Sequence, residues 1–106
     1  MCEQKLKDKV AIITGGAQGI GRAIAEKLGS EGAKIIIVDV LEEAAKKTAD
    51  EISKTQNVAT LSLKVDVSSS IETEEMIKKT VEKFGKIDII INNAGITRDN
   101  LLIRMS

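Results

Sequence analysis

Short apolar segments alternate along this chain with longer stretches in which apolar residues recur at helical spacing, and this alternation constrains the fold most strongly. The apolar segments predict strands at about residues 10–14, 35–39, 58–67 and 87–92. Strands separated by helices are typical of repeated βαβ units, which form a parallel sheet with helices on both faces. No proline-rich or low-complexity linker interrupts the pattern, so we expect residues 1–106 to form one α/β domain.

The strand expected at 58–67 differs from the other three. Its residues alternate, with Ala59, Leu61, Leu63 and Val65 on one face and Thr60, Ser62 and Lys64 on the other. A strand covered on both faces is apolar throughout, whereas a less covered strand alternates. We therefore place this strand at a sheet edge, in the order 3-2-1-4 (counted along the chain) of the first half of a doubly wound, Rossmann-type fold.

Helices are expected at about residues 19–28 and 41–55, with a third that begins near Ser69 and ends at Gly85. Ser69 followed by Glu72 matches a capping box at the start of the third helix. The residues predicted to face the core are Ile20, Ala23, Ile24 and Leu28 in the first helix, Leu41, Ala45, Thr48, Ala49 and Ile52 in the second, and Ile77, Val81 and Phe84 in the third.

The first strand runs directly into the glycine-rich sequence TGGAQGIG at residues 14–21. Gly15 permits a sharp turn off the strand, Gly19 removes a side chain where a ligand must approach the backbone, and Gly21 allows close packing of helix on sheet. The unpaired N–H groups at the start of the following helix attract anions. This loop therefore predicts a dinucleotide diphosphate site. It lacks the lysine of a phosphate-binding loop of the NTPase type, which disfavours a kinase or NTPase.

Asp39 ends the second strand, eighteen positions after Gly21. A carboxylate there accepts hydrogen bonds from the ribose hydroxyls of adenosine and repels a 2′-phosphate, so we expect NAD as the cofactor and NADP as less favoured. Neither Ala17 nor Gln18 supplies the arginine that a 2′-phosphate would attract. The alternative is that Asp39 only starts the following helix.

The composition excludes several other kinds of function. The chain has no His, Tyr, Trp or Pro, so a Ser-His-Asp triad and a histidine-bound zinc site are excluded. Cys2 is the only cysteine, which excludes an internal disulfide. Sixteen basic residues balance sixteen acidic ones, which argues against a nucleic-acid partner. The polar N-terminus and the absence of a long apolar run predict a cytoplasmic protein without a membrane partner.

The spacing TGxxxGxG, together with Asn92, Asn93, Ala94 and Gly95 at the end of the fourth strand, resembles the short-chain dehydrogenase/reductase family. The sequence NNAGITRDNLLIRM at 92–105 is similar to the 3-oxoacyl-[acyl-carrier-protein] reductases of fatty acid biosynthesis. The resemblance covers residues 9–106. It implies an oxidoreductase that binds a nicotinamide dinucleotide.

The resemblance also implies the site residues. They are Gly15, Gln18, Gly19, Ile20 and Gly21 at the pyrophosphate, Asp39 at the adenosine ribose, Asp66 and Val67 at the adenine, and Asn93, Ala94 and Gly95 beneath the cofactor ribose. All of them fall at the carboxyl ends of the expected parallel strands, where such folds bind ligands. The alternatives are that Asp66 caps a helix and that 92–95 is a simple tight turn.

The chain departs from the family pattern in two respects. Many of the acyl-carrier-protein reductases prefer NADPH, whereas Asp39 indicates NAD. The family's chemistry also uses a Ser, a Tyr and a Lys in the second half of the fold, and this chain has no Tyr, while Ser106 follows residues 92–95 too closely to be the family's serine. We therefore assign no catalytic residue and no metal ligand, and we expect dinucleotide binding without turnover.

Two alternatives to this interpretation remain open. The chain could be an incompletely recorded NAD(P)-dependent reductase, or a self-associating half domain that binds no ligand. In the half fold, the apolar strand at 87–92 lacks the strand that would follow it and is expected to have an open edge. We therefore predict a homodimer or a swapped oligomer that pairs through this edge.

Overall fold

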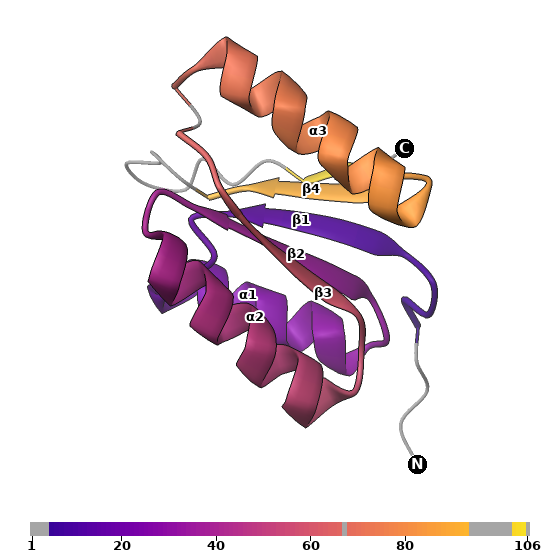
Figure 1. The fold of residues 1–106 in the computed structure, drawn as a ribbon. Helices are drawn as coiled ribbons and strands as arrows, with labels where there is room; N and C mark the ends of the chain where they lie inside the picture. The colour runs from indigo at the N-terminus through magenta and orange to yellow at the C-terminus, as the bar shows by residue number, and fades with distance from the viewer. Residues whose placement is uncertain (1–4, 67, 94–102, 106) are drawn as a thin grey trace.

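The computed structural model describes residues 5–66, 68–93 and 103–105 of the chain. Within these residues the strands are β1 (Val10–Thr14), β2 (Lys34–Asp39), β3 (Thr60–Lys64), β4 (Ile89–Asn92) and β5 (Ile103–Met105), and they form one sheet in the order β3-β2-β1-β4-β5. The first four strands are parallel (Figure 1). The α/β class, the order 3-2-1-4 and the edge position of β3 are therefore confirmed.

Three helices cover this sheet in the described part of the chain. They are α1 (Gly19–Ser30), α2 (Glu42–Gln56) and α3 (Ser70–Phe84). Helices α1 and α2 lie on one face of the sheet and α3 lies on the other (Figure 1). This arrangement gives two apolar cores, one between the sheet and α1 and α2, and one between the sheet and α3.

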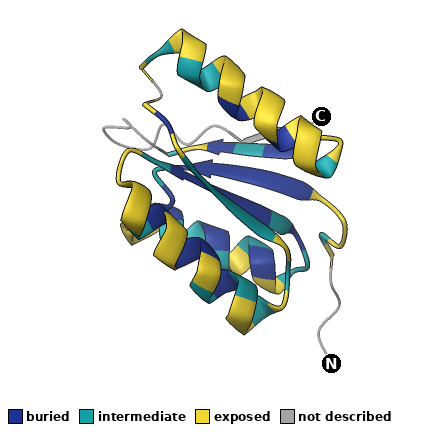
Figure 2. Cartoon of the chain, in the orientation of Figure 1, coloured by how far each residue is buried: buried dark blue, intermediate teal, exposed yellow. Residues whose placement is uncertain are grey.

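Strands β1 and β2 supply the middle of both cores (Figure 2). Successive side chains of β1 alternate between the cores, with Ala11 and Ile13 toward α1 and α2, and Val10 and Ile12 toward α3. All four are fully buried. Each buried isoleucine contributes about 1.5–3 kcal/mol of transfer free energy, which explains why this strand is apolar at every position.

The core face that we predicted for helix α1 is confirmed only in part, since Ile24 and Leu28 pack against the core as expected. Ile20 is 65% exposed and Ala23 is exposed, whereas Gly21, Ala25 and Gly29 are buried. The small residues at these spacings let the helix lie close against the glycine-rich loop at Gly21 and against α2 at Gly29. Because they form the contact stripe, Ile20 points away from the core at the first turn.

Helices α2 and α3 confirm the predicted faces only in part. In α2 the residues from Ala45 to Ile52 that we assigned to the core are buried as expected, but Leu41 precedes the helix and is 49% exposed. In α3 the predicted Ile77 and Val81 are exposed, because the helix turns Met76 and Thr80 toward the sheet.

Both predicted ends of α3 are confirmed. The Ser69 hydroxyl accepts a hydrogen bond from the Glu72 N–H at 3.3 Å, and Gly85 follows the helix with a left-handed φ of 83°. The Glu72 carboxylate does not complete the capping box, because it accepts the Asp66 N–H at 3.0 Å instead. The start of α3 is thereby tied to the end of β3.

Strands β3 and β4 are shorter than predicted, for local reasons. Beyond β3, the Asp66 carboxylate bonds to Ser68 and turns the chain toward α3. Before β4, the side chain of buried Asp88 accepts the Val10 N–H at 2.9 Å. In each case a side-chain hydrogen bond takes the place of a further regular strand residue.

The expectation of an open edge at β4 is wrong. Strand β5, which the sequence pattern did not predict, pairs with β4 in antiparallel register, with Ile90 opposite Arg104. Homodimerisation stays a prediction, but an open β4 edge no longer supports it. No helix in the described ranges is both long and apolar enough to span a membrane.

Candidate functional site

The glycine-rich loop leaves β1 through a tight turn that is fixed to β2. Gly15 adopts a φ of 64°, a left-handed conformation that favours glycine. Its N–H donates to the Val38 carbonyl at 2.7 Å, and the Gly16 N–H shares that acceptor at 3.3 Å. The predicted role of Gly15 as the turn residue is consistent with this geometry, and the loop starts from a defined position at the carboxyl end of the sheet.

At Gly21, helix α1 lies close against the glycine-rich loop. A Cβ atom at Gly21 would collide with the Gly15 carbonyl oxygen and would lie 2.7 Å from Nδ2 of Asn93. Only a residue without a side chain fits between these two groups. The backbone of the first helical turn is thus held against the ends of β1 and β4.

The first turn of α1 is suited to an anion. Gln18 precedes the helix without capping it through its side chain, and the first turn contains no acidic residue. A helix leaves its first N–H groups without intrahelical partners, and they carry partial positive charge. Gly19 has a φ of 66°. A Cβ atom added there would have no neighbour within 4 Å, so there is space beside the loop at this residue. These features fit a dinucleotide diphosphate.

Two side chains from other elements hold the backbone of Ala17, which is buried in the middle of the loop. Its N–H donates to Oδ2 of Asp39 at 3.2 Å, and its carbonyl accepts the Thr48 hydroxyl at 2.6 Å. The sequence pattern identified Asp39 as a ligand-binding residue and Thr48 only as a core residue. The contact of Thr48 with the loop was missed, because 31 residues separate the two partners and no local pattern links them.

Asp39 takes part in the turn into α2 and keeps capacity for a ligand. Its Oδ1 accepts the Leu41 N–H at 3.1 Å, which shapes the turn into α2. A carboxylate has about four lone-pair sites on its two oxygens. The two backbone N–H groups of Ala17 and Leu41 use one on each oxygen, so the partly exposed side chain can still accept ribose hydroxyls.

A second set of hydrogen bonds joins the ends of β1 and β4. The Asn93 N–H donates to Oγ1 of Thr14 at 2.9 Å, and Nδ2 of Asn93 donates to the Gly15 carbonyl at 3.2 Å. The Thr14 hydroxyl also lies 3.2 Å from Oδ1 of Asn92. Thr14 opens the glycine-rich motif, yet it was not among the predicted site residues. Its place directly before Gly15 was the available signal.

Asp66 lies at the same edge of the sheet, beyond the end of β3. Its Oδ1 accepts the Ser68 hydroxyl at 2.6 Å and the Ser68 N–H at 2.9 Å. These bonds, the hydroxyl first, lower the pKa of Asp66 below its ordinary value. The N-cap of α3 is Ser69, so Asp66 is not the capping residue. It presents an exposed carboxylate, as an adenine contact requires.

The structure thus brings together most of the predicted site. Gly15 and Asn93 directly follow β1 and β4, and Asp39 is the last residue of β2. The three are connected through the loop by hydrogen bonds. Asp66 lies at the neighbouring strand end without a direct bond to the loop. The predicted site residues Val67, Ala94 and Gly95 lie outside the described residues.

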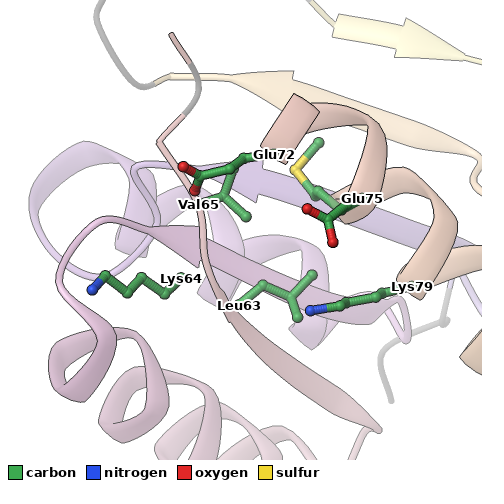
Figure 3. A pocket seen from close by; sticks show the side chains of 7 residues that line it. Leu63, Lys64, Val65, Glu72, Glu75 and Lys79 are labelled. Atoms are coloured by element: carbon green, nitrogen blue, oxygen red, sulfur yellow. The ribbon is translucent and has the colours of Figure 1, made fainter. Parts of the chain in front are cut away.

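A separate hollow of about 260 Å³ lies between β3 and α3 (Figure 3). It is lined by Leu63, Lys64, Val65, Glu72, Glu75, Met76 and Lys79. None of these residues belongs to the glycine-rich loop. The hollow contains acidic and basic side chains in equal number, so its charge favours neither an anion nor a cation, and we do not assign it to the dinucleotide.

Comparison with known proteins shows the family to which the chain belongs. A sequence profile of the family described as "short chain dehydrogenase" matches residues 9–106. The 3-oxoacyl-[acyl-carrier-protein] reductase FabG of Aquifex aeolicus is 45% identical over 108 aligned residues, which cover 98% of this chain and 42% of that protein. FabG of Escherichia coli is 46% identical over 97 residues, covering 92% of this chain and 38% of that protein.

Solved structures of similar fold include complexes with both forms of the cofactor. An NAD⁺-bound xylitol dehydrogenase matches with a TM-score of 0.82 and 35% identity over 87% of this chain and 35% of its own. An L-sorbose reductase from Gluconobacter frateurii, complexed with NADPH and L-sorbose, matches with a TM-score of 0.84 and 34% identity over 90% of this chain and 36% of its own. This chain spans about two fifths of the length of its curated relatives. Its sequence and fold place it in the short-chain dehydrogenase family.

Proposed function

We propose that these residues form the NAD(H)-binding part of a short-chain oxidoreductase. The observation that carries the proposal is the hydrogen bond between Asp39 and the Ala17 N–H at 3.2 Å. This contact sets an anionic ribose acceptor directly beside an uncapped, electropositive helix start. The adenosine diphosphate part of a dinucleotide requires two such neighbouring sites. One site binds the ribose hydroxyls and the other binds the phosphates.

The loop and α1 would hold the diphosphate through backbone N–H groups. The glycines at 19 and 21 support this role, since the first leaves space for a ligand and the second lets the helix start reach the strand ends. The exposed carboxylate of Asp66 would accept a hydrogen bond from the adenine amino group. The nicotinamide of the bound cofactor would supply the hydride, while the residues described here bind and orient its adenosine end.

Asp39 supports NAD(H) over NADP(H). A 2′-phosphate on the ribose would bring its negative charges within about 4 Å of the Asp39 carboxylate. Each such pair of like charges is unfavourable by about 1–4 kcal/mol at the effective dielectric of a protein surface. The carboxylate would instead accept the unmodified ribose hydroxyl. One solved relative holds NAD⁺ and another holds NADPH. The fold by itself therefore does not determine which cofactor is preferred, and we attribute the preference to local residues such as Asp39.

Calorimetric titration with NADH and NADPH tests the proposal. The unmodified chain is expected to bind NADH at least about tenfold more tightly than NADPH. Asp39→Asn should weaken NADH binding and strengthen NADPH binding, because it removes the charge while retaining one acceptor oxygen. Asp50→Asn, an exposed change on α2, is the matched control and should alter neither affinity. Equal or tighter NADPH binding by the unmodified chain would contradict the preference, and absence of binding to either would contradict the site.

For a complete reductase that contains these residues, the reaction class that we propose is reduction of a 3-oxoacyl thioester. Its support is the identity of 45–46% with two FabG reductases over nearly the whole chain. Reduction of a carbonyl needs a proton donor to the developing alkoxide. The 106 residues contain neither Tyr nor His, so we propose binding without turnover for the polypeptide of these residues alone. An intact mass of the natural protein more than twice that of 106 residues would favour the complete reductase.

A further inference from the structure

Thr48 makes a contact that its position in a helix does not explain. Its side chain is 1% exposed, and its hydroxyl donates to the Ala17 carbonyl in the glycine-rich loop at 2.6 Å. A helical threonine commonly bonds to the carbonyl four residues earlier. Other threonines of this chain do so, at Thr55, Thr73 and Thr80. Thr48 instead reaches another element.

The bond fixes the direction of one peptide group. The carbonyl of Ala17 and the N–H of Gln18 belong to the same planar trans peptide, in which they point in opposite directions. Because Thr48 holds the carbonyl toward the buried side, the Gln18 N–H is directed away from α2. Gln18 and the two residues after it are exposed, so this N–H faces the open side of the loop. The opposite orientation would place a carbonyl oxygen there, which would repel a phosphate.

The hydroxyl is itself held in place relative to α1. Glu51, three residues after Thr48 in α2, accepts a charge-assisted hydrogen bond from Arg22 of α1 at 2.6 Å. Ala45, Ala49 and Ile52 anchor the same face of α2 in the core. The loop carbonyl therefore meets a donor whose position is set by the packing of two helices.

We propose that Thr48 is a positioning residue for the diphosphate. Its hydroxyl holds the Ala17–Gln18 peptide so that the Gln18 N–H can donate to a phosphate oxygen of the dinucleotide. This inference rests on the proposed dinucleotide function and adds a determinant outside the glycine-rich loop. This positioning affects binding of the diphosphate and not binding of the adenosine.

The test compares Thr48→Val with Thr48→Ser. Valine keeps the shape of threonine and removes the hydroxyl, whereas serine keeps the hydroxyl. Affinities for ADP and for adenosine, measured by NMR titration of the folded chain, separate the phosphate contribution from that of the adenosine. Thr48→Val should weaken ADP binding by about tenfold and leave adenosine binding within about twofold, because a buried carbonyl loses its side-chain donor and the peptide can turn. Thr48→Ser should restore ADP binding to within about threefold of the unmodified chain.

Thr80→Val is the matched control. Thr80 is also a buried helical threonine, but its hydroxyl bonds within α3 to the Met76 carbonyl at 2.9 Å. The control should lower thermal stability about as much as Thr48→Val and leave the ratio of ADP to adenosine affinity unchanged. A purely structural role for Thr48 would make the two variants alike in this ratio.

The Gln18 amide resonance gives an independent measurement in the unmodified chain. ADP should shift this resonance strongly, and adenosine should not. The inference is overturned if ADP leaves the Gln18 amide unchanged, if Thr48→Val binds ADP normally, or if it weakens ADP and adenosine equally. These outcomes all require that the unmodified chain binds ADP. Failure of the unmodified chain to bind ADP or NADH would instead overturn the proposed function, and this inference with it.

Discussion

Gly21→Ala perturbs the close approach of α1 to the glycine-rich loop. The added Cβ would overlap the Gly15 carbonyl oxygen, and it would lie 2.9 Å from the carbon of that carbonyl and 2.7 Å from Nδ2 of Asn93. Unstrained contacts between carbon atoms are about 3.5–4.0 Å, so the loop and the helix start must separate by about 1 Å. The loop cannot yield easily, because the Gly15 N–H is bonded to Val38 and the Gly15 carbonyl accepts Nδ2 of Asn93.

This separation has two expected effects. Overpacking of this kind destabilises a fold by about 1–3 kcal/mol, and about 1 kcal/mol lowers Tm by about 4–8 °C in a domain near this size. The displaced N–H groups should also weaken NADH binding by about tenfold to a hundredfold, since a hydrogen bond to a charged group contributes about 1.5–3 kcal/mol. Thermal unfolding followed by circular dichroism and calorimetric titration with NADH measure the two effects.

Gly29→Ala is the matched control on the same helix. A Cβ there would meet the Ile52 side chain at 3.3 Å and the side-chain methylenes of Gln56 at 3.4 Å or more, and these side chains can adjust. Alanine is favoured over glycine inside a helix by about 0.5–1 kcal/mol, so this variant should keep the Tm and the NADH affinity close to those of the unmodified chain. If Gly21→Ala behaves like Gly29→Ala in both assays, the close approach does not govern the site.

Two further predictions concern stability. Burial raises the pKa of Asp88, but the hydrogen bond from Val10 and the neighbouring Lys86 lower it by more, so the folded-state pKa is below the ordinary value. The stabilisation by Asp88 is therefore present above about pH 4 and is lost as the pH falls through the folded-state pKa. Asp88→Asn should lower the Tm at neutral pH and flatten the decrease of the Tm in acid. Parallel acid profiles of the Tm for the two proteins would contradict this prediction. Ser69→Ala should destabilise the chain by about 1 kcal/mol, because α3 loses its cap. Ser70→Ala, at the exposed position beside it, is the control and should leave the midpoint of urea unfolding unchanged. Equal urea midpoints for the two variants would exclude a role of the cap.

Local pattern was sufficient for most of the fold. Continuous apolar runs identified β1 and β2, and the alternation of residues 59–65 placed β3 at an edge, because burial on one or two faces acts on each strand's own residues. The glycine spacing identified the loop, since the positive φ at Gly15 and Gly19 is a local backbone requirement. The faces of α1 and α3 were predicted less well. Apolar spacing gave the helical period, but contacts with the sheet selected Gly21 and Met76 over Ile20 and Ile77.

The sequence by itself determined the α/β class, the strand order and the residues Gly15, Gly21 and Asp39 as site candidates. Only the tertiary structure revealed that Thr48 holds the loop, that Glu72 bonds to Asp66, and that β5 closes the edge of β4. The physical reason is the range of the interactions. Period and turn propensity act over a few neighbouring residues, whereas the partner of a buried hydroxyl or of a strand edge is decided by which distant segments the packed core brings into contact.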